Sequence, residues 1–122
     1  MYMDFDSDMP IYIQVAEELE NAILSGASKE GTQVPSTTEI SVRYKINPAT
    51  ALKGISKLAD DGILYKKRGI GMFVAKGAKE KLKLKRKQLF FESYVMPLIS
   101  EANKLSIERR DIEEMIKRGF EK

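Results

Sequence analysis

The sequence predicts a mainly helical protein with one small antiparallel β-hairpin, an α+β class dominated by helices. Apolar residues recur every three or four positions over several long segments, which is the period of an α-helix. Two short runs at 63–67 and 72–74 flank the turn Arg68-Gly69-Ile70-Gly71, which predicts strand, turn and strand. The chain has 122 residues, 43% of them hydrophobic, so it has room for one domain and a small appendage.

The N-terminal third should contain a leader, a helix and a loop. Residues 1–9 are expected to be a mobile leader. A first helix should begin at Pro10 and run to about Ser25, where Gly26 ends it. In the loop that follows, Gln33-Val34 is expected to form a brief strand beside the hairpin.

Two short helices separated by a tight turn should come next. Ser36-Thr37-Thr38-Glu39 has the spacing of a capping box, so a helix should run from there to about Tyr44. Asn47 is a good N-cap, and Pro48 fits the first helical turn because the amide hydrogen it lacks would have no partner there. This pattern predicts a helix-turn-helix over about 37–56 and a wing over about 63–74, together a winged helix-turn-helix domain at 10–75.

The remaining residues should form a two-helix C-terminal dimerisation tail at 77–120. A long helix is expected over about 77–102, kinked near Pro97, and Ser106 should cap a last helix that Gly119 ends. Two helices cannot bury this much apolar surface against a small domain, so we expect a second copy of the chain to cover it. Folding back onto the first helix is the alternative. The predicted interface residues are Leu89, Phe91, Val95, Leu98, Ile112 and Ile116.

Charge is distributed unevenly along the chain, although the net charge is only +3. Residues 1–28 contain six acids and no base, whereas residues 29–88 contain fifteen bases and five acids. Positive charge therefore coincides with the predicted helix-turn-helix and hairpin, as expected for a nucleic-acid-binding segment. A solvated basic surface is the alternative interpretation.

The composition argues against an enzyme and against a metal site. The chain has no cysteine and no histidine, which removes the commonest catalytic base, metal ligand and thiol nucleophile. The acidic pairs Asp60-Asp61 and Glu113-Glu114 are adjacent in sequence rather than facing each other. We therefore expect no cofactor. Since no apolar run is long enough for a membrane span and the acidic N-terminus is unlike a signal peptide, we also expect a soluble, cytoplasmic protein with no membrane partner.

Double-stranded DNA is the predicted partner, with contacts from three places. The start of the second helix should face a phosphate, the outer face of the third helix should enter a groove, and the glycine-flanked hairpin tip should approach the backbone or minor groove. A plain helix cap, a solvated face and an ordinary turn are the respective alternatives. The predicted contacts are Ser36, Thr37, Thr38, Asn47, Thr50, Lys53, Lys57, Arg68, Gly69 and Gly71.

Residues 10–75 resemble, in order and without gaps, the winged-helix domain of the GntR-type bacterial regulators. The resemblance rests on Pro10–Ala16, Gly26, Val34-Pro35-Ser36, Asn47–Ala51, Leu58–Leu64 and Arg68–Val74. The short two-helix tail and the Asn-Pro-x-Thr helix start are similar to the YtrA subfamily. The resemblance implies a homodimeric repressor that binds an inverted-repeat operator, often of genes for ABC-type transport.

The chain departs from the family pattern at positions that commonly read bases. Thr38 stands where GntR proteins commonly have an arginine, Pro48 and Leu52 stand where many branches have two more, and Met72 replaces a small hydroxyl residue of the wing. Sequence preference should therefore differ from that of arginine-bearing relatives. The alternative is a winged-helix dimer that acts mainly as a protein-interaction module, with weak nonspecific DNA binding.

A small-molecule effector, if one exists, should bind between the dimer helices, because no separate ligand domain is predicted. Phe90, Phe91 and Tyr94 are the candidate lining residues. Aromatic residues at helical spacing are also what a core or an interface uses, and an apolar lining without converging polar groups is weak support for a site.

Overall fold

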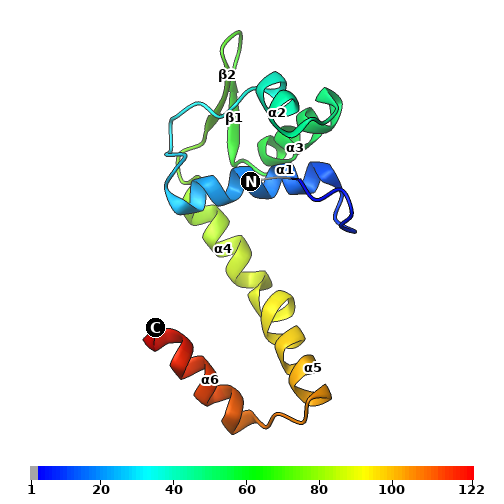
Figure 1. Cartoon of the computed structure of the whole chain (residues 1–122). Helices are drawn as coiled ribbons and strands as arrows, with labels where there is room; N and C mark the ends of the chain where they lie inside the picture. Colours follow the sequence, from blue (N-terminus) through cyan, green and yellow to red (C-terminus); the bar gives the residue numbers. More distant parts are fainter. Residues whose placement is uncertain (1–2) are drawn as a thin grey trace. The chain divides into compact units, whose positions relative to one another are not determined.

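The computed structural model describes residues 3–122 (Figure 1). They divide into two compact units, the first extending to Leu84 and the second running from Lys85 to Lys122. The mainly helical class with one small antiparallel sheet is confirmed. The elements are α1 (Ile11–Ser25), α2 (Thr37–Tyr44), α3 (Pro48–Asp60), β1 (Leu64–Lys67), β2 (Gly71–Val74), α4 (Ala78–Phe90), the π-helical turn η1 (Phe91–Val95), α5 (Met96–Lys104) and α6 (Arg109–Glu121).

In the first unit, α1 packs closely against α3, and α2 packs against α3 (Figure 1). The crossing of α1 and α3 needs a glycine, because a Cβ atom on Gly54 would lie 2.8 Å from the carbonyl oxygen of Tyr12 and 2.8 Å from Val15 Cγ1. The core beneath this crossing contains Val15, Leu19, Ile23, Ile40, Ala51, Ile55, Leu58, Ile63, Val74 and Leu82.

The first unit continues beyond the hairpin into α4. Ala78 and Leu82 are buried in the core that α1 and α3 also build, and Leu82 is 0% exposed. The first turns of α4 therefore belong to the winged-helix core. This matters for any truncation, because a cut before Ala78 would remove core residues.

The hairpin pairs in register from Leu64 opposite Val74 to Lys67 opposite Gly71. A short extended segment pairs beside β2: the amide of Val74 donates to the carbonyl of Thr32 at 2.9 Å, and the amide of Val34 donates to the carbonyl of Met72 at 2.9 Å. The pairing predicted for Gln33-Val34 is present as a single bridge from Gln33 to Phe73, and not as a full strand of the sheet. This extra pairing anchors the hairpin to the helical body.

The prediction of a mobile leader is wrong for residues 3–9, and residues 1–2 lie outside the described part of the chain. Met3 is only 4% exposed and belongs to the core. The Gln14 side chain accepts a hydrogen bond from the amide of Asp4 at 2.8 Å, and it donates to the carbonyls of Asp4 and Met9 at 2.8 and 2.9 Å. One amide side chain on α1 thus holds both ends of the segment.

Three helix boundaries in the second unit differ from the predicted ones: the end of the long helix and both ends of the last helix. The expected distortion near Pro97 is present as the π turn η1, in which the amide of Met96 donates to the carbonyl of Phe91, five residues earlier. Proline has no amide hydrogen, so the hydrogen-bond ladder has to rearrange around it. The rearrangement lets the helix continue to Lys104, beyond the predicted end near residue 102.

The caps of the last helix were predicted wrongly. Glu108 is the N-cap of α6, and its amide donates to Asp111 Oδ2 at 3.4 Å. Ser106 instead has a left-handed backbone with φ of 56° within the connecting turn. Gly119 does not end α6, which continues to Glu121.

Candidate nucleic-acid interface

The N-terminus of α2 is built by the predicted capping box. The amide of Glu39 donates to Ser36 Oγ at 3.0 Å, and the amide of Ser36 donates to Glu39 Oε1 at 3.0 Å. Two hydrogen bonds from Ser36 lower the pKa of the Glu39 carboxyl below its ordinary value. The bond from the backbone has the larger effect, and the bond from the hydroxyl has the smaller one. Ser36 and Thr38 are exposed and Thr37 is half-buried. The cap is confirmed, whereas phosphate contacts by these residues stay a prediction.

Helix α3 begins at a second confirmed cap. Asn47 Oδ1 accepts a hydrogen bond from the amide of Ala49 at 2.8 Å, and Pro48 occupies the first helical position. The helix turns Ala51, Gly54, Ile55 and Leu58 inward. The opposite side is therefore exposed, as the helical period requires. The exposed residues there are Pro48, Ala49, Leu52, Lys53 and Ser56.

The predicted basic residues of α3 are engaged within the protein. Lys53 Nζ lies 4.1 Å from the centroid of the Tyr12 ring on α1. Lys57 Nζ lies 3.2 Å from Asp61 Oδ2, one turn further along. Thr50 is half-buried. Thr50, Lys53 and Lys57 lie on one side of α3, as predicted, and from this side Lys53 reaches α1.

The hairpin tip carries the predicted wing residues. The amide of Ile70 donates to the carbonyl of Lys67 at 2.9 Å and closes the turn, with Arg68 and Gly69 exposed. Gly71 has φ of 146°, and a Cβ there would lie 2.5 Å from Gln33 Nε2. The same Gln33 amide donates to the carbonyl of Ile70 at 3.0 Å. Gly71 is therefore needed for the bracing of the tip, and its DNA contact stays a prediction.

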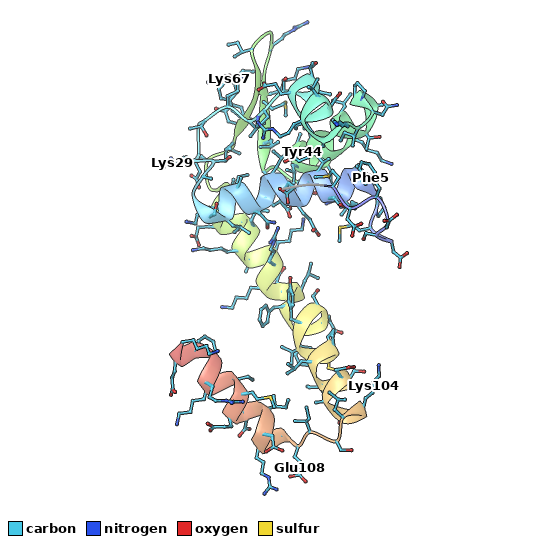
Figure 2. All side chains as sticks on the ribbon, viewed as in Figure 1. Phe5, Lys29, Tyr44, Lys67, Lys104 and Glu108 are labelled. Atoms are coloured by element: carbon cyan, nitrogen blue, oxygen red, sulfur yellow. The ribbon has the colours of Figure 1, made fainter. Side chains whose placement is uncertain are left out.

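Lys67 is a candidate contact that the sequence analysis missed. Lys67 lies on the hairpin (Figure 2). Its Nζ lies 4.2 Å from the Phe73 ring centroid and 5.9 Å from that of Tyr65, and the two rings stack with their centroids 5.9 Å apart. Register places Tyr65 opposite Phe73. The sequence could have predicted this cluster of Tyr65, Lys67 and Phe73. Side chains alternate between the two faces of a strand, so all three lie on one face of the hairpin.

The comparisons with known proteins agree with this geometry. The family described as bacterial regulatory proteins, gntR family, matches residues 11–74, which span the three helices and the hairpin. The chain belongs to the GntR family. It is 30% identical to the HTH-type transcriptional repressor YtrA of Bacillus subtilis (strain 168) over 94% of this chain and 88% of the relative.

Two solved structures extend the likeness of this GntR protein. A putative GntR-family transcriptional regulator from Bacteroides thetaiotaomicron is 32% identical, with a TM-score of 0.72 over 91% of this chain and 96% of that chain. The DNA-binding domain of AraR, solved in complex with operator ORX1, is 28% identical, with a TM-score of 0.56 over 62% of this chain and 99% of that chain. The resemblance to the GntR family and to YtrA is confirmed, and the chain is a DNA-binding transcription regulator rather than an enzyme.

The second unit of this GntR protein holds the predicted dimer residues in two groups. Val95, Leu98, Ile112 and Ile116 line one groove of about 400 Å³ between α5 and α6. Leu89 and Phe91 lie outside it and are exposed. No helix in the described part of the chain is long and apolar enough to cross a membrane.

The aromatic residues considered for an effector do not line this groove. Phe90 and Tyr94 contact each other with ring centroids 5.3 Å apart, and both are exposed, as is Phe91. The groove is lined mainly by aliphatic side chains, with Asn103, Arg109 and Glu113 as its polar members. A small-molecule effector therefore stays a prediction.

Proposed function

We propose that this GntR regulator is a homodimeric repressor that binds an inverted-repeat operator. The observation that carries the proposal is the 30% identity to a transcriptional repressor over 94% of the chain, which includes the tail as well as the winged helix. Two-fold symmetric dimers place two recognition helices about one helical turn of DNA apart, and their operators share that symmetry.

The apolar surface of the second unit supports the dimer. Large apolar side chains on α4, η1, α5 and α6 remain exposed, among them Leu89, Phe91, Leu98 and Ile116. Helix α6 has no buried residue although its sequence is amphipathic. A high density of exposed large apolar side chains is typical of association sites. A second copy of the chain supplies a matching surface, because a two-fold interface is self-complementary.

The proposed recognition elements are α3 and the hairpin tip. The first half of α3 contacts base edges, the N-terminus of α2 and Arg68 contact phosphates, and Lys53 adds positive charge beside the groove. The local excess of bases over acids in residues 29–88 supports this assignment. Genes for transport are proposed as targets, on the likeness to the YtrA subfamily.

Selection of random duplexes by the purified full-length protein tests the proposal. We expect a palindromic consensus with two half-sites, and the enriched sequences can then be located upstream of genes in the source genome. Selection that yields no consensus at low salt would contradict sequence-specific repression. That result would favour the alternative of a protein-interaction module with weak nonspecific DNA binding.

Two measurements separate the parts of the proposal. Sedimentation of the free protein reports the dimer, and a mobility-shift titration with a single half-site reports whether two copies bind together. A palindromic consensus bound by a protein that is monomeric at every concentration would refute the tail as the dimer interface, while leaving operator binding in place.

A further inference from the structure

The exposed side of the recognition helix is apolar where it should meet DNA bases. Pro48, Ala49 and Leu52 are all exposed in the first two turns of α3. Leu52 is 53% exposed, although the helix buries its neighbour Ala51 completely. None of the three side chains carries a hydrogen-bond donor or acceptor.

Two of the polar side chains nearest to this strip have partners within the protein. Asn47 Oδ1 caps the helix through the amide of Ala49 at 2.8 Å, and Lys53 Nζ lies over the Tyr12 ring. Ser56 follows one turn after Leu52 and is exposed. The strip formed by Pro48, Ala49 and Leu52 therefore presents carbon to a base edge, with the Ser56 hydroxyl one turn further along and the half-buried Thr50 on the flank.

An exposed leucine is ordinary on a protein surface, so its place in the fold decides the argument. In a helix-turn-helix, the N-terminal residues of the second helix contact base edges in the major groove. Guanine is read there by a bidentate arginine or lysine, whereas thymine presents a C5-methyl group that an apolar side chain can contact. Leucine has no donor for the first contact and is well suited to the second, and the ammonium group of its neighbour Lys53 lies over the Tyr12 ring.

We propose that Leu52, with Ala49 beside it, is a specificity-determining residue that reads the C5-methyl group of thymine in each operator half-site. This inference rests on the proposed sequence-specific operator binding. It assigns an A·T or T·A pair to the base step beneath Leu52. It also explains how the chain distinguishes sequences although Thr38, Pro48 and Leu52 offer no guanidinium.

Replacement of thymine by uracil tests the proposal, because it deletes only the methyl group. Each thymine of the selected consensus is replaced in turn, and binding of the full-length protein is measured by fluorescence anisotropy. At the contacted position we expect affinity to fall about fourfold, the factor that corresponds to roughly 0.8 kcal/mol for one buried carbon group. The Leu52→Ala variant should bind the thymine and uracil duplexes equally at that position.

Leu84→Ala is the matched control. Leu84 is 59% exposed on α4, in the same unit, and this variant should keep the wild-type preference for thymine over uracil. Thermal melts of both variants check folding, which truncation of an exposed leucine should leave intact. A Leu52→Arg variant, put through a fresh duplex selection, should exchange the A·T pair at that position for a guanine-bearing pair.

The outcomes distinguish this inference from the proposed function. Wild-type protein that tolerates uracil at every thymine, or Leu52→Ala protein that discriminates as the wild type does, overturns methyl reading while the consensus stands. A consensus with no thymine also overturns it. If selection yields no consensus, the operator itself is refuted, and the inference falls with it.

Discussion

The ammonium group of Lys53 lies 4.1 Å from the centre of the Tyr12 ring and joins α3 to α1. A cation over an aromatic face is attracted by the ring, by about 0.5–1 kcal/mol at an exposed site. The contact limits the rotamers of Lys53 and places its charge at the flank of α3. A lysine held in this way is suited to a phosphate rather than to a base edge.

Alanine substitution of Lys53 and of Arg68 should weaken operator binding and flatten its salt dependence. Each lost phosphate contact should reduce the slope of log affinity against log salt by about 0.9, because fewer counterions are released. Anisotropy titrations at several salt concentrations measure both quantities. Lys117→Ala, in the second unit, is the control and should leave the slope unchanged. Unchanged slopes for Lys53→Ala and Arg68→Ala would remove these residues from the interface.

Gly54→Ala should destabilise the winged-helix unit. The new Cβ would lie 2.8 Å from both the Tyr12 carbonyl oxygen and Val15 Cγ1, so α1 and α3 would have to separate. Overpacking of this kind costs about 1–3 kcal/mol in the free energy of unfolding. Gly119→Ala is the matched control, because its Cβ would meet nothing within 4 Å and alanine favours a helix by about 1 kcal/mol. Urea unfolding should therefore show opposite signs for the two variants.

The ionised carboxylate of Glu39 should stabilise the protein at neutral pH and lose this effect in acid. Its folded-state pKa is lowered by the hydrogen bonds from Ser36, so its contribution is present above the ordinary carboxyl pKa and is lost as pH falls through the folded value. Glu39→Gln should therefore lower the melting temperature at pH 7. The difference from wild type should shrink as pH falls below the ordinary carboxyl pKa and through the lower folded-state value, where the carboxyl protonates in both states. A difference independent of pH would contradict the capping role of the charge.

Glu18 should behave in the opposite way. Burial raises its folded-state pKa, and its Oε2 atom is buried without a hydrogen-bond partner among residues 3–122. For a raised pKa, full stability is present below the ordinary value and declines as pH rises through the folded value. Glu18→Gln should thus raise the melting temperature at pH 7, with little gain at pH 4. The exposed neighbour Glu17, changed to Gln, should not reproduce this gain.

Charge introduced into the groove of the second unit should prevent dimerisation. Leu98 and Ile116 both line that groove, so Leu98→Glu and Ile116→Glu place a carboxylate in the proposed interface. Unpaired buried charge is costly, and we expect a monomer by sedimentation velocity at micromolar concentration. Leu84→Glu is the control, since Leu84 lies in the first unit. Dimers that survive both substitutions would place the interface elsewhere.

Truncation is a poorer test of the dimer than substitution. The predicted boundary after residue 76 would remove Ala78 and Leu82, which are buried in the winged-helix core. Loss of a fully buried leucine typically costs about 2–5 kcal/mol, which could unfold the first unit. A monomer obtained from that cut would therefore not identify the interface.

The sequence by itself determined the elements whose causes lie within a few residues. The Ser36–Glu39 capping box, the Asn47-Pro48 helix start and the Gly26 helix end each depend on hydrogen bonds or backbone angles of neighbouring residues. The hairpin likewise depends on its own turn. These elements can be predicted from the sequence because the groups that form each hydrogen bond lie only two to four positions apart.

Tertiary structure decided the features whose partners lie far apart in the chain. The leader is ordered by Gln14, Lys53 is held by Tyr12, and Leu82 joins a core that begins at Met3. In each case a residue of ordinary type acquires its role only when packing brings a distant element beside it. Helical periodicity assigns a residue to a face, but the neighbour that covers this face, or leaves Leu52 uncovered, depends on how α1, α2 and α3 pack together.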